Sequence, residues 1–181
     1  MRSREACEGR WYRGGMPLTL CELITPIPHL MESMPAFLHG PPLPPGTAAP
    51  DFTLSDQNGN QVTLSKLLGQ NVVLIFYPRD ETPVCRRQLC EFRDQWELAK
   101  RKDTLVFGVN AGSSESHSGF HSNLNLPFPL LVDDDNKTAR LYRAKGLLMT
   151  VRTVYLVDKH GRIAYAKRGK PNPEEVLASA V

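Results

Sequence analysis

Cys85 is the residue whose surroundings in this sequence are best suited to chemistry. It lies in the stretch 77–90, where an apolar run ends, a polar turn follows and a helix is predicted to begin. Thr82 is a good N-cap residue, and Pro83 suits the first helical position because its missing N–H is not needed there. Cys85 then falls in the first helical turn, where unpaired backbone N–H groups and the helix dipole stabilise a thiolate. The stretch therefore predicts a nucleophilic cysteine.

A second cysteine, Cys90, follows five residues later on the same predicted helix. On an ideal helix this spacing separates the two Cα atoms by about 8.7 Å, which exceeds the limit of roughly 7 Å for a disulfide. If Cys85 and Cys90 ever bond, the start of the helix must unwind, so oxidation would be coupled to a local conformational change. The spacing alone also fits two small buried hydrophobes on a core helix.

The charges near Cys85 act in opposite directions. Asp80 and Glu81 disfavour a thiolate, whereas nearby arginines favour it. These arginines are Arg79, Arg86 and Arg87. An arginine from a distant strand could decide the balance, and Arg152, at the entrance to an apolar strand, is the obvious candidate.

Two metal-site alternatives are weaker. His117 and His121 have helical i, i+4 spacing. They could join the two cysteines in a zinc site, but the intervening segment is longer than usual and contains a predicted buried strand. We interpret both histidines as surface residues of a short helix. The segment 133–136 resembles the start of a calcium loop but lacks its glycine and glutamate, and a helix cap after a strand explains it.

The composition is that of a globular protein of ordinary size. The chain has 181 residues, 41% of them apolar, and a formal net charge of +3, which gives no reason to expect nucleic acid or an acidic membrane surface as a partner. No apolar run is long enough to span a bilayer. The four cysteines are too few and too irregularly spaced for a disulfide framework, so we expect a reducing compartment and a cytoplasmic location.

The chain is predicted to consist of an extension, residues 1–42, and a folded domain, residues 43–181. Repeated prolines interrupt any regular element in the extension. In the domain, apolar runs at 71–77 and 104–109 predict buried strands joined by a helix over 83–101, which makes a βαβ unit. The other expected elements are a hairpin of 52–54 and 61–64 around Asn58-Gly59, helices over 114–121 and 136–142, strands at 129–132, 153–157 and 162–166, and a helix from Pro173 capped by Asn172. This pattern predicts an α/β fold with a mixed sheet, whose ligands collect at the carboxyl ends of the parallel strands.

The residues around Cys85 resemble a known family. The pattern Pro78-x-x-x-Thr82-x-x-Cys85 is similar to the active-site motif of peroxiredoxins. Cys90 resembles the resolving cysteine of the subgroup named bacterioferritin comigratory protein or peroxiredoxin Q. Further similar segments occur in the right order at 44–52, 90–94, 126–131 and 152–158. The resemblance covers about residue 43 to the end of the chain.

This resemblance implies a thioredoxin-like fold and the reduction of hydrogen peroxide or organic hydroperoxides without a metal or an organic cofactor. Cys85 would attack the peroxide, Thr82 would hydrogen-bond it, and Pro78 would shield the sulfur from water. Arg152 would stabilise both the thiolate and the charge that develops on the leaving oxygen. Cys90 would then form a disulfide with Cys85, and thioredoxin or a glutaredoxin-like dithiol would reduce that disulfide.

The family resemblance also leads us to expect a monomer, with a dimer as the alternative, and no nucleic-acid or membrane partner. In a different functional class, the same cysteine pair would make a peroxide-sensing binding protein with slow turnover.

Two residues depart from the subgroup. Val84 stands where glycine is frequent, and we expect its side chain to narrow the site or stiffen the helix start. Gln88 stands where glutamate is frequent, so an ion pair that orients the active-site arginine would become a neutral hydrogen bond.

Overall fold

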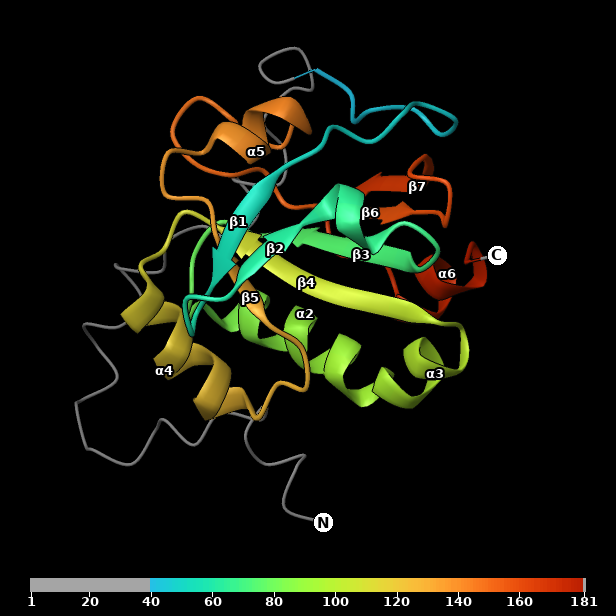
Figure 1. Ribbon diagram of the computed structural model, residues 1–181. Coiled ribbons are helices and arrows are strands. Elements are labelled where there is room, and N and C mark those ends of the chain that lie inside the picture. The colour runs from blue at the N-terminus through green and yellow to red at the C-terminus, as the bar shows by residue number, and fades with distance from the viewer. Residues whose placement is uncertain (1–39, 181) are drawn as a thin grey trace, which may run out of the picture.

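The computed structural model describes residues 40–180, so the predicted extension lies, apart from residues 40–42, outside the described residues. The described chain forms one sheet with helices packed on it (Figure 1). In chain order the elements are β1 (Thr53–Asp56), β2 (Gln61–Thr63), the 3-10 helix η2 (Leu64–Leu67), β3 (Asn71–Phe76), α2 (Pro83–Asp94), α3 (Trp96–Arg101), β4 (Thr104–Asn110), α4 (Ser114–Leu124), β5 (Leu130–Val132), α5 (Lys137–Leu141), β6 (Thr153–Val157), β7 (Ile163–Arg168) and α6 (Pro173–Ala178). Within residues 40–180, no helix has the length and apolar character needed to cross a lipid bilayer.

The strands form a seven-stranded mixed sheet in the order β2-β1-β5-β4-β3-β6-β7. β3 is parallel to β4 on one side and antiparallel to β6 on the other. β4 also pairs in parallel with β5, while antiparallel hairpins form both edges of the sheet. The α/β fold with a mixed sheet that the sequence predicts is therefore confirmed.

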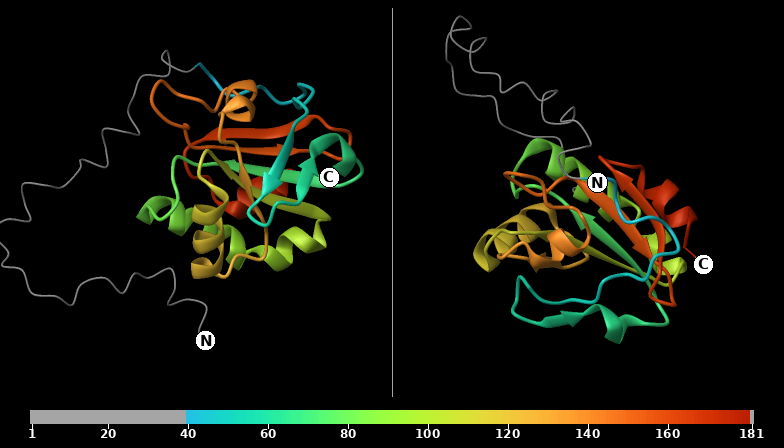
Figure 2. Two further views of the ribbon diagram at one scale, coloured as in Figure 1. Left: turned by 60° about the vertical axis from the view of Figure 1, so that its left-hand side comes forward. Right: turned by 90° about the horizontal axis from the view of Figure 1, so that it is seen from above.

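β3 is buried on both of its faces because helices pack on both sides of the sheet (Figures 1 and 2). Val73 and Ile75 belong to the core shared with α2, α3, α4 and α6. Leu74 and Phe76 belong to the core shared with α5. A strand with apolar neighbours above and below reads as a continuous apolar run and not as an alternating pattern, which is why β3 was recognisable from the sequence.

The helix predicted over residues 83–101 is divided in two at Gln95. The backbone of Gln95 leaves the helical conformation, with φ −98° and ψ 14°, and α3 begins at the next residue, Trp96. Trp96 packs near Phe128, with the ring centroids 6.2 Å apart. The helix expected to end at His121 continues to Leu124 as α4. The sequence therefore placed these helices correctly but not all of their boundaries.

Short polar motifs form the turns and helix ends that the sequence predicts. Asn58-Gly59 joins β1 to β2, and Gly59 has a positive φ of 85°. The side chain of Asn172 caps α6 by accepting a hydrogen bond from an N–H in its first turn. Asp133, after β5, accepts hydrogen bonds from two N–H groups in the first turns of α5. The acidic segment 133–136 is thus part of a helix cap, as expected.

The ends of β3 and β6 lie side by side because the two strands are antiparallel. Their register pairs Phe76, the last residue of β3, with Thr153, the first residue of β6. The chain after β3 leads to Cys85, and Arg152 directly precedes β6. The parallel neighbour β4 ends at the same edge of the sheet. The sheet therefore brings three strand ends together at the start of α2.

We expect the sheet core to dominate stability. Leu74→Ala removes a fully buried side chain from β3 and leaves a cavity, so the free energy of unfolding should fall by about 2–5 kcal/mol. Urea denaturation followed by circular dichroism measures this change. Leu68→Ala, at a position that is 60% exposed, is the control and should change the free energy by less than about 0.5 kcal/mol. Equal effects of the two substitutions would contradict the assignment of Leu74 to the core.

Candidate active site

Cys85 lies in the first turn of α2, as predicted. Thr82 is the N-cap residue and Pro83 is the first residue of the helix. The N–H of Arg86 donates to the C=O of Thr82 at 2.9 Å, so the N–H groups of Val84 and Cys85 precede this helical hydrogen bond. Together with the helix dipole, they favour an anion at this place. Cys85 itself is a free and fully buried thiol.

Arg152 supplies a second positive charge to the sulfur of Cys85. Its Nη2 lies 3.2 Å from Sγ of Cys85, and its Nη1 donates a hydrogen bond to Oε1 of Gln88. Gln88 is fully buried on α2, less than one helical turn after Cys85. The predicted contact between Arg152 and Cys85 is therefore present. Gln88 holds the guanidinium of Arg152 by accepting this hydrogen bond, and because Gln88 is neutral, the positive charge of Arg152 acts mainly on the sulfur.

Thr82 and Pro78 lie in the turn that leads from β3 into α2. Thr82 is the N-cap residue by position, but its side chain makes no capping hydrogen bond to the helix. The hydroxyl lies 3.5 Å from the carbonyl oxygen of Arg79, which is at the limit of hydrogen bonding. Thr82 is therefore the N-cap residue that the sequence predicts, and its hydroxyl is not used to cap the helix. Pro78 is half-buried at the beginning of the turn.

Cys90 lies on the same helix as Cys85 and is almost fully buried. Because α2 is helical throughout Pro83–Asp94, helical spacing places the two Cα atoms about 8.7 Å apart. Cys85 is a free thiol, so the two cysteines are not bonded to each other in this state. A disulfide between them requires part of α2 to unwind.

The contacts that hold α2 differ along its length. Phe92 is buried in the core, and the buried Arg93 donates from Nη1 to the C=O of Leu124, at the end of α4, over 2.8 Å. In the first turn, Arg86 forms a partly exposed ion pair with Glu81 over 2.5 Å. An exposed pair of this kind contributes up to about 1 kcal/mol, less than burial of an aromatic side chain. The first turn of α2 thus combines this partly exposed ion pair with the buried side chain of Cys85.

Known proteins with similar sequences identify the family. The AhpC/TSA family profile matches residues 45–166. The chain belongs to the AhpC/TSA family. "Peroxiredoxin Q, chloroplastic" of Oryza sativa subsp. japonica is 41% identical over 139 residues, which cover 75% of this chain and 64% of that protein. The protein of the same name from Arabidopsis thaliana is 43% identical over 133 residues, which cover 72% of this chain and 62% of that protein.

Solved structures of AhpC/TSA proteins have the same fold. Peroxiredoxin Q of Xanthomonas campestris is 28% identical with a TM-score of 0.69, covering 76% of this chain and 94% of that one. Peroxidoxin BcpB of Mycobacterium tuberculosis is 27% identical with a TM-score of 0.70, covering 75% and 95%. The thioredoxin-like fold and the similarity to the peroxiredoxin Q subgroup are confirmed. The matched region spans less than two thirds of the length of the rice and Arabidopsis relatives.

In this AhpC/TSA chain, His117 is fully buried and not a surface residue, so our interpretation from the sequence was wrong. His117, Phe120 and Leu124 are the buried residues of α4. Their spacing of three and then four residues is the sequence signal of a buried helix face. The signal was missed because histidine was read as a polar surface residue. His121, one turn later, is partly buried.

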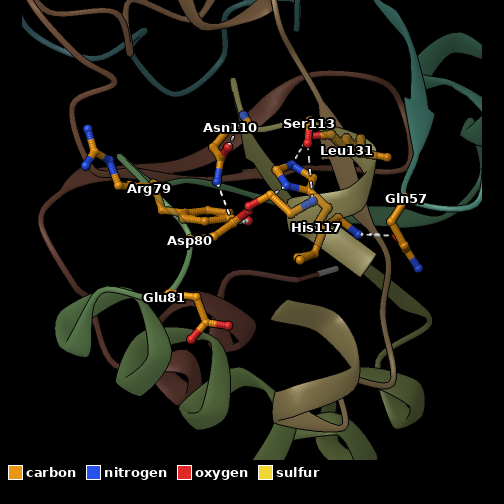
Figure 3. A network of polar contacts seen from close by, with 12 residues as sticks. Gln57, Arg79, Asp80, Glu81, Asn110, Ser113, His117 and Leu131 are labelled. Carbon is orange, nitrogen blue, oxygen red and sulfur yellow. Dashed lines mark hydrogen bonds and ion pairs between the residues drawn. The ribbon is translucent and has the colours of Figure 1, made fainter. Parts of the chain in front are cut away.

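Asp80 is the centre of a buried polar network (Figure 3). Its carboxylate accepts hydrogen bonds from Tyr77 Oη at 2.8 Å, Asn110 Nδ2 at 2.9 Å, Ser116 Oγ at 2.5 Å and His117 Nδ1 at 2.9 Å. These donors belong to the end of β3, the end of β4 and the first turn of α4. Asp80 is therefore more than the unfavourable charge that the sequence suggested, because it joins three elements behind the active-site turn.

The network shifts the pKa values of two of its members. Burial acts to raise the pKa of Asp80, but hydrogen bonds from His117 and Ser116 and the electrostatic interaction with His117 outweigh it, so the pKa is lowered. Burial raises the pKa of Tyr77 well above its usual value, and the negative charges of Asp80 and Cys85 raise it further. Tyr77 is therefore a neutral hydrogen-bond donor that lies close to both Asp80 and Cys85.

The zinc site considered from the sequence is not formed by the described residues. Within residues 40–180, no group of three or more His, Cys, Asp and Glu side chains could hold a metal ion. Both ring nitrogens of His117 already face protein acceptors, Oδ2 of Asp80 and the carbonyl oxygen of Leu131. The histidine is thus engaged in the network around Asp80.

We expect Arg152 to set the pH at which Cys85 ionises. In Arg152→Gln the cation next to Sγ is lost, so formation of the thiolate should shift to a pH higher by about one unit. Ultraviolet absorbance of the thiolate during a pH titration measures the midpoint, and Cys85→Ser identifies which part of the signal belongs to Cys85. Arg79→Gln, at an exposed position of the same turn, is the matched control. A shift of equal size in both variants would contradict a specific role of Arg152.

We expect Asp80 to make stability depend on pH. Because its pKa is lowered in the folded state, its contribution is fully present above the usual carboxyl value of about 3.9 and is lost as the pH falls through the folded-state value. Asp80→Asn should therefore lower the free energy of unfolding most at neutral pH, and the difference from wild type should shrink below about pH 4. Urea denaturation at several pH values measures this. Asp134→Asn, at an exposed site, should show no such trend.

Proposed function

We propose that the chain is a thiol peroxidase that reduces hydrogen peroxide and organic hydroperoxides, with Cys85 as the nucleophile. The observation that carries this proposal is the 3.2 Å contact between Nη2 of Arg152 and Sγ of Cys85 at the start of α2. A thiolate at this position is stabilised from two directions, by the guanidinium and by the helix N-terminus. Membership of the AhpC/TSA family supports the same conclusion.

In the first step, the thiolate of Cys85 attacks one oxygen of the peroxide. A sulfur–oxygen bond forms, the oxygen–oxygen bond breaks, and the other oxygen leaves with the electron pair and takes up a proton to become water or an alcohol. Cys85 is oxidised to a sulfenic acid. Arg152 stabilises the charge that develops on the leaving oxygen, and the hydroxyl of Thr82 donates a hydrogen bond to the bound peroxide. Pro78 shields the sulfur from water.

In the second step, Cys90 resolves the sulfenic acid. Once Cys90 is itself in the reduced form, its thiolate attacks Sγ of Cys85, a disulfide forms, and the hydroxyl group leaves as water after protonation. The two residues share one helix, so the start of α2 must unwind before the sulfur atoms can meet.

In the third step, an external dithiol reduces the disulfide by exchange and is itself oxidised. We propose thioredoxin or a glutaredoxin-like protein for this role, and no metal or organic cofactor takes part in any step. Organic hydroperoxides are included as substrates because the structurally similar bacterioferritin comigratory protein of Xanthomonas campestris has alkyl peroxide reduction activity.

A monomeric state and a cytoplasmic location belong to the same proposal. The plant relatives are named chloroplastic, so subcellular fractionation is the measurement that decides the location. Size-exclusion chromatography with light scattering decides between the monomer and the alternative dimer.

The two cysteines should have separable roles. Cys85→Ser should abolish peroxide consumption. Cys90→Ser should still reduce one equivalent of peroxide per chain but should not be recycled by a thioredoxin system. Rapid mixing with one equivalent of peroxide measures the first reaction, and steady-state assay with thioredoxin and its reductase measures the second. Full turnover by Cys85→Ser would refute the proposal, and slow turnover of the wild type with every dithiol would favour a peroxide sensor.

A further inference from the structure

The imidazole ring of His117 lies between two hydrogen-bond acceptors. Nδ1 is 2.9 Å from Oδ2 of Asp80, and Nε2 is 3.2 Å from the carbonyl oxygen of Leu131. A neutral imidazole has one N–H, so it could satisfy only one of these acceptors. Both contacts are hydrogen bonds only if both ring nitrogens carry a proton.

The hydrogen bonds around Asp80 require its carboxylate to be ionised. Oδ1 of Asn110 accepts a hydrogen bond from the N–H of Gly112, so the amide orientation is fixed and its Nδ2 must donate to Asp80. Tyr77 and Ser116 also donate to the carboxylate. A carboxylate that accepts from several donors has no proton of its own to share. The ring of His117 therefore faces an anion on one side and a carbonyl dipole on the other.

The space around His117 is closed on the remaining side by Gly112. A Cβ atom at Gly112 would lie only 2.7 Å from Cε1 of His117 and 2.8 Å from Oδ1 of Asn110. A residue with a side chain would displace the ring or the amide. The ring is therefore fixed in one orientation.

Asp80 and the neighbouring Glu81 attach the active-site turn to α4 in different ways. Asp80 points into the network, whereas Glu81 points away from it (Figure 3). Glu81 has a positive φ of 59°, and its carboxylate binds Arg86 in α2 and accepts a hydrogen bond from Asn123 in α4. Asp80 binds the fully buried His117. The turn is thus held to α4 by a buried contact of Asp80 and by an exposed contact of Glu81.

Tyr77 connects the carboxylate of Asp80 with the surroundings of Cys85. Tyr77 donates to Asp80, and the negative charges of both Asp80 and Cys85 act on its hydroxyl. An uncompensated carboxylate at this place would oppose formation of the Cys85 thiolate. A cation in direct contact with the carboxylate would compensate its charge most strongly, and Asp80 is 6% exposed.

The groups that surround Asp80 and His117 are mostly neutral. Asn110 at the end of β4, Ser116 on α4 and the Leu131 carbonyl on β5 are neutral, and Tyr77 at the end of β3 is a neutral donor. Among the described residues in contact with the Asp80 carboxylate, His117 is therefore the one that can be positively charged.

We propose that His117 is a buried imidazolium that acts as the counter-ion of Asp80 and thereby favours the thiolate of Cys85. His117 is a positioning and electrostatic residue and not a catalytic one, because it touches neither the sulfur nor the substrate site. This inference rests on the proposed function only in naming the Cys85 thiolate as the reacting group. Its test needs no peroxide, so it can fail while the peroxidase assignment stands.

Two substitutions separate the charge of His117 from its hydrogen bond. In His117→Asn, the amide nitrogen can take the place of Nδ1 and keep the hydrogen bond to Asp80, but the positive charge is lost. In Ser116→Ala, one hydrogen bond to Asp80 is lost while the charge is kept. His117→Asn should shift the pH midpoint of Cys85 thiolate formation upward by about one unit, by Coulomb's law at an effective dielectric constant of about 20. Ser116→Ala should leave the midpoint unchanged.

The thiolate absorbance titration described for Arg152 measures these midpoints. His121→Gln, one turn further along α4, is the matched control and should behave as wild type. An unchanged midpoint in His117→Asn, or an equal shift in Ser116→Ala, would overturn the proposal, because either result would mean that the charge is not what matters.

A measurement on the wild-type protein keeps the proposal falsifiable if His117→Asn does not fold. Nitrogen NMR of the histidine side chains distinguishes an imidazolium from either neutral tautomer. Both ring nitrogens of His117 should carry a proton in the folded protein at neutral pH, because each faces an acceptor. A neutral ring at His117 under these conditions would overturn the proposal.

Discussion

The active site depends on the antiparallel pairing of β3 with β6. Backbone hydrogen bonds fix the register of the two strands, and with it the place at which one strand ends and the other begins. Arg152 and the turn before Cys85 are attached to those two ends, so the guanidinium reaches the sulfur without a long loop. A slip of one residue would move Arg152 to the other face of the sheet. The pairing of β3 with β6 therefore fixes the position of the Arg152 guanidinium relative to Cys85.

The helix α2 meets two opposing requirements. Its first turn must be formed to present Cys85 with the helix N-terminus behind it, yet the same turn must open for Cys85 to reach Cys90. The later part of α2 is held by burial of Phe92 and by the hydrogen bond from Arg93 to α4, and the start by burial of Cys85 and by a partly exposed ion pair of Arg86. Local unwinding then leaves most of the core intact.

The buried network behind the turn explains how an acidic residue can lie close to a reactive thiolate. In a low dielectric, an unpaired carboxylate is costly and acts strongly on its neighbours. Asp80 is instead surrounded by four donors, one of which is the imidazole of His117. α4 thus contributes two of the donors to Asp80, Ser116 and His117, and neither of them forms a hydrogen bond with Cys85. The charges near Cys85 are thus influenced by Arg152, which precedes β6, and by the residues of α4 that contact Asp80.

The sequence by itself determined the local features. The apolar runs defined β3, β4 and β6, the Thr82-Pro83 pair marked the start of α2, and the family motif indicated Cys85 and Arg152. Each of these depends on neighbouring residues or on a motif. The two acceptors that face His117, the four donors to Asp80 and the absence of a capping hydrogen bond from Thr82 were decided only by the tertiary structure. Hydrogen bonds of buried side chains join residues far apart in the chain, and no local pattern records which acceptor a buried donor will find.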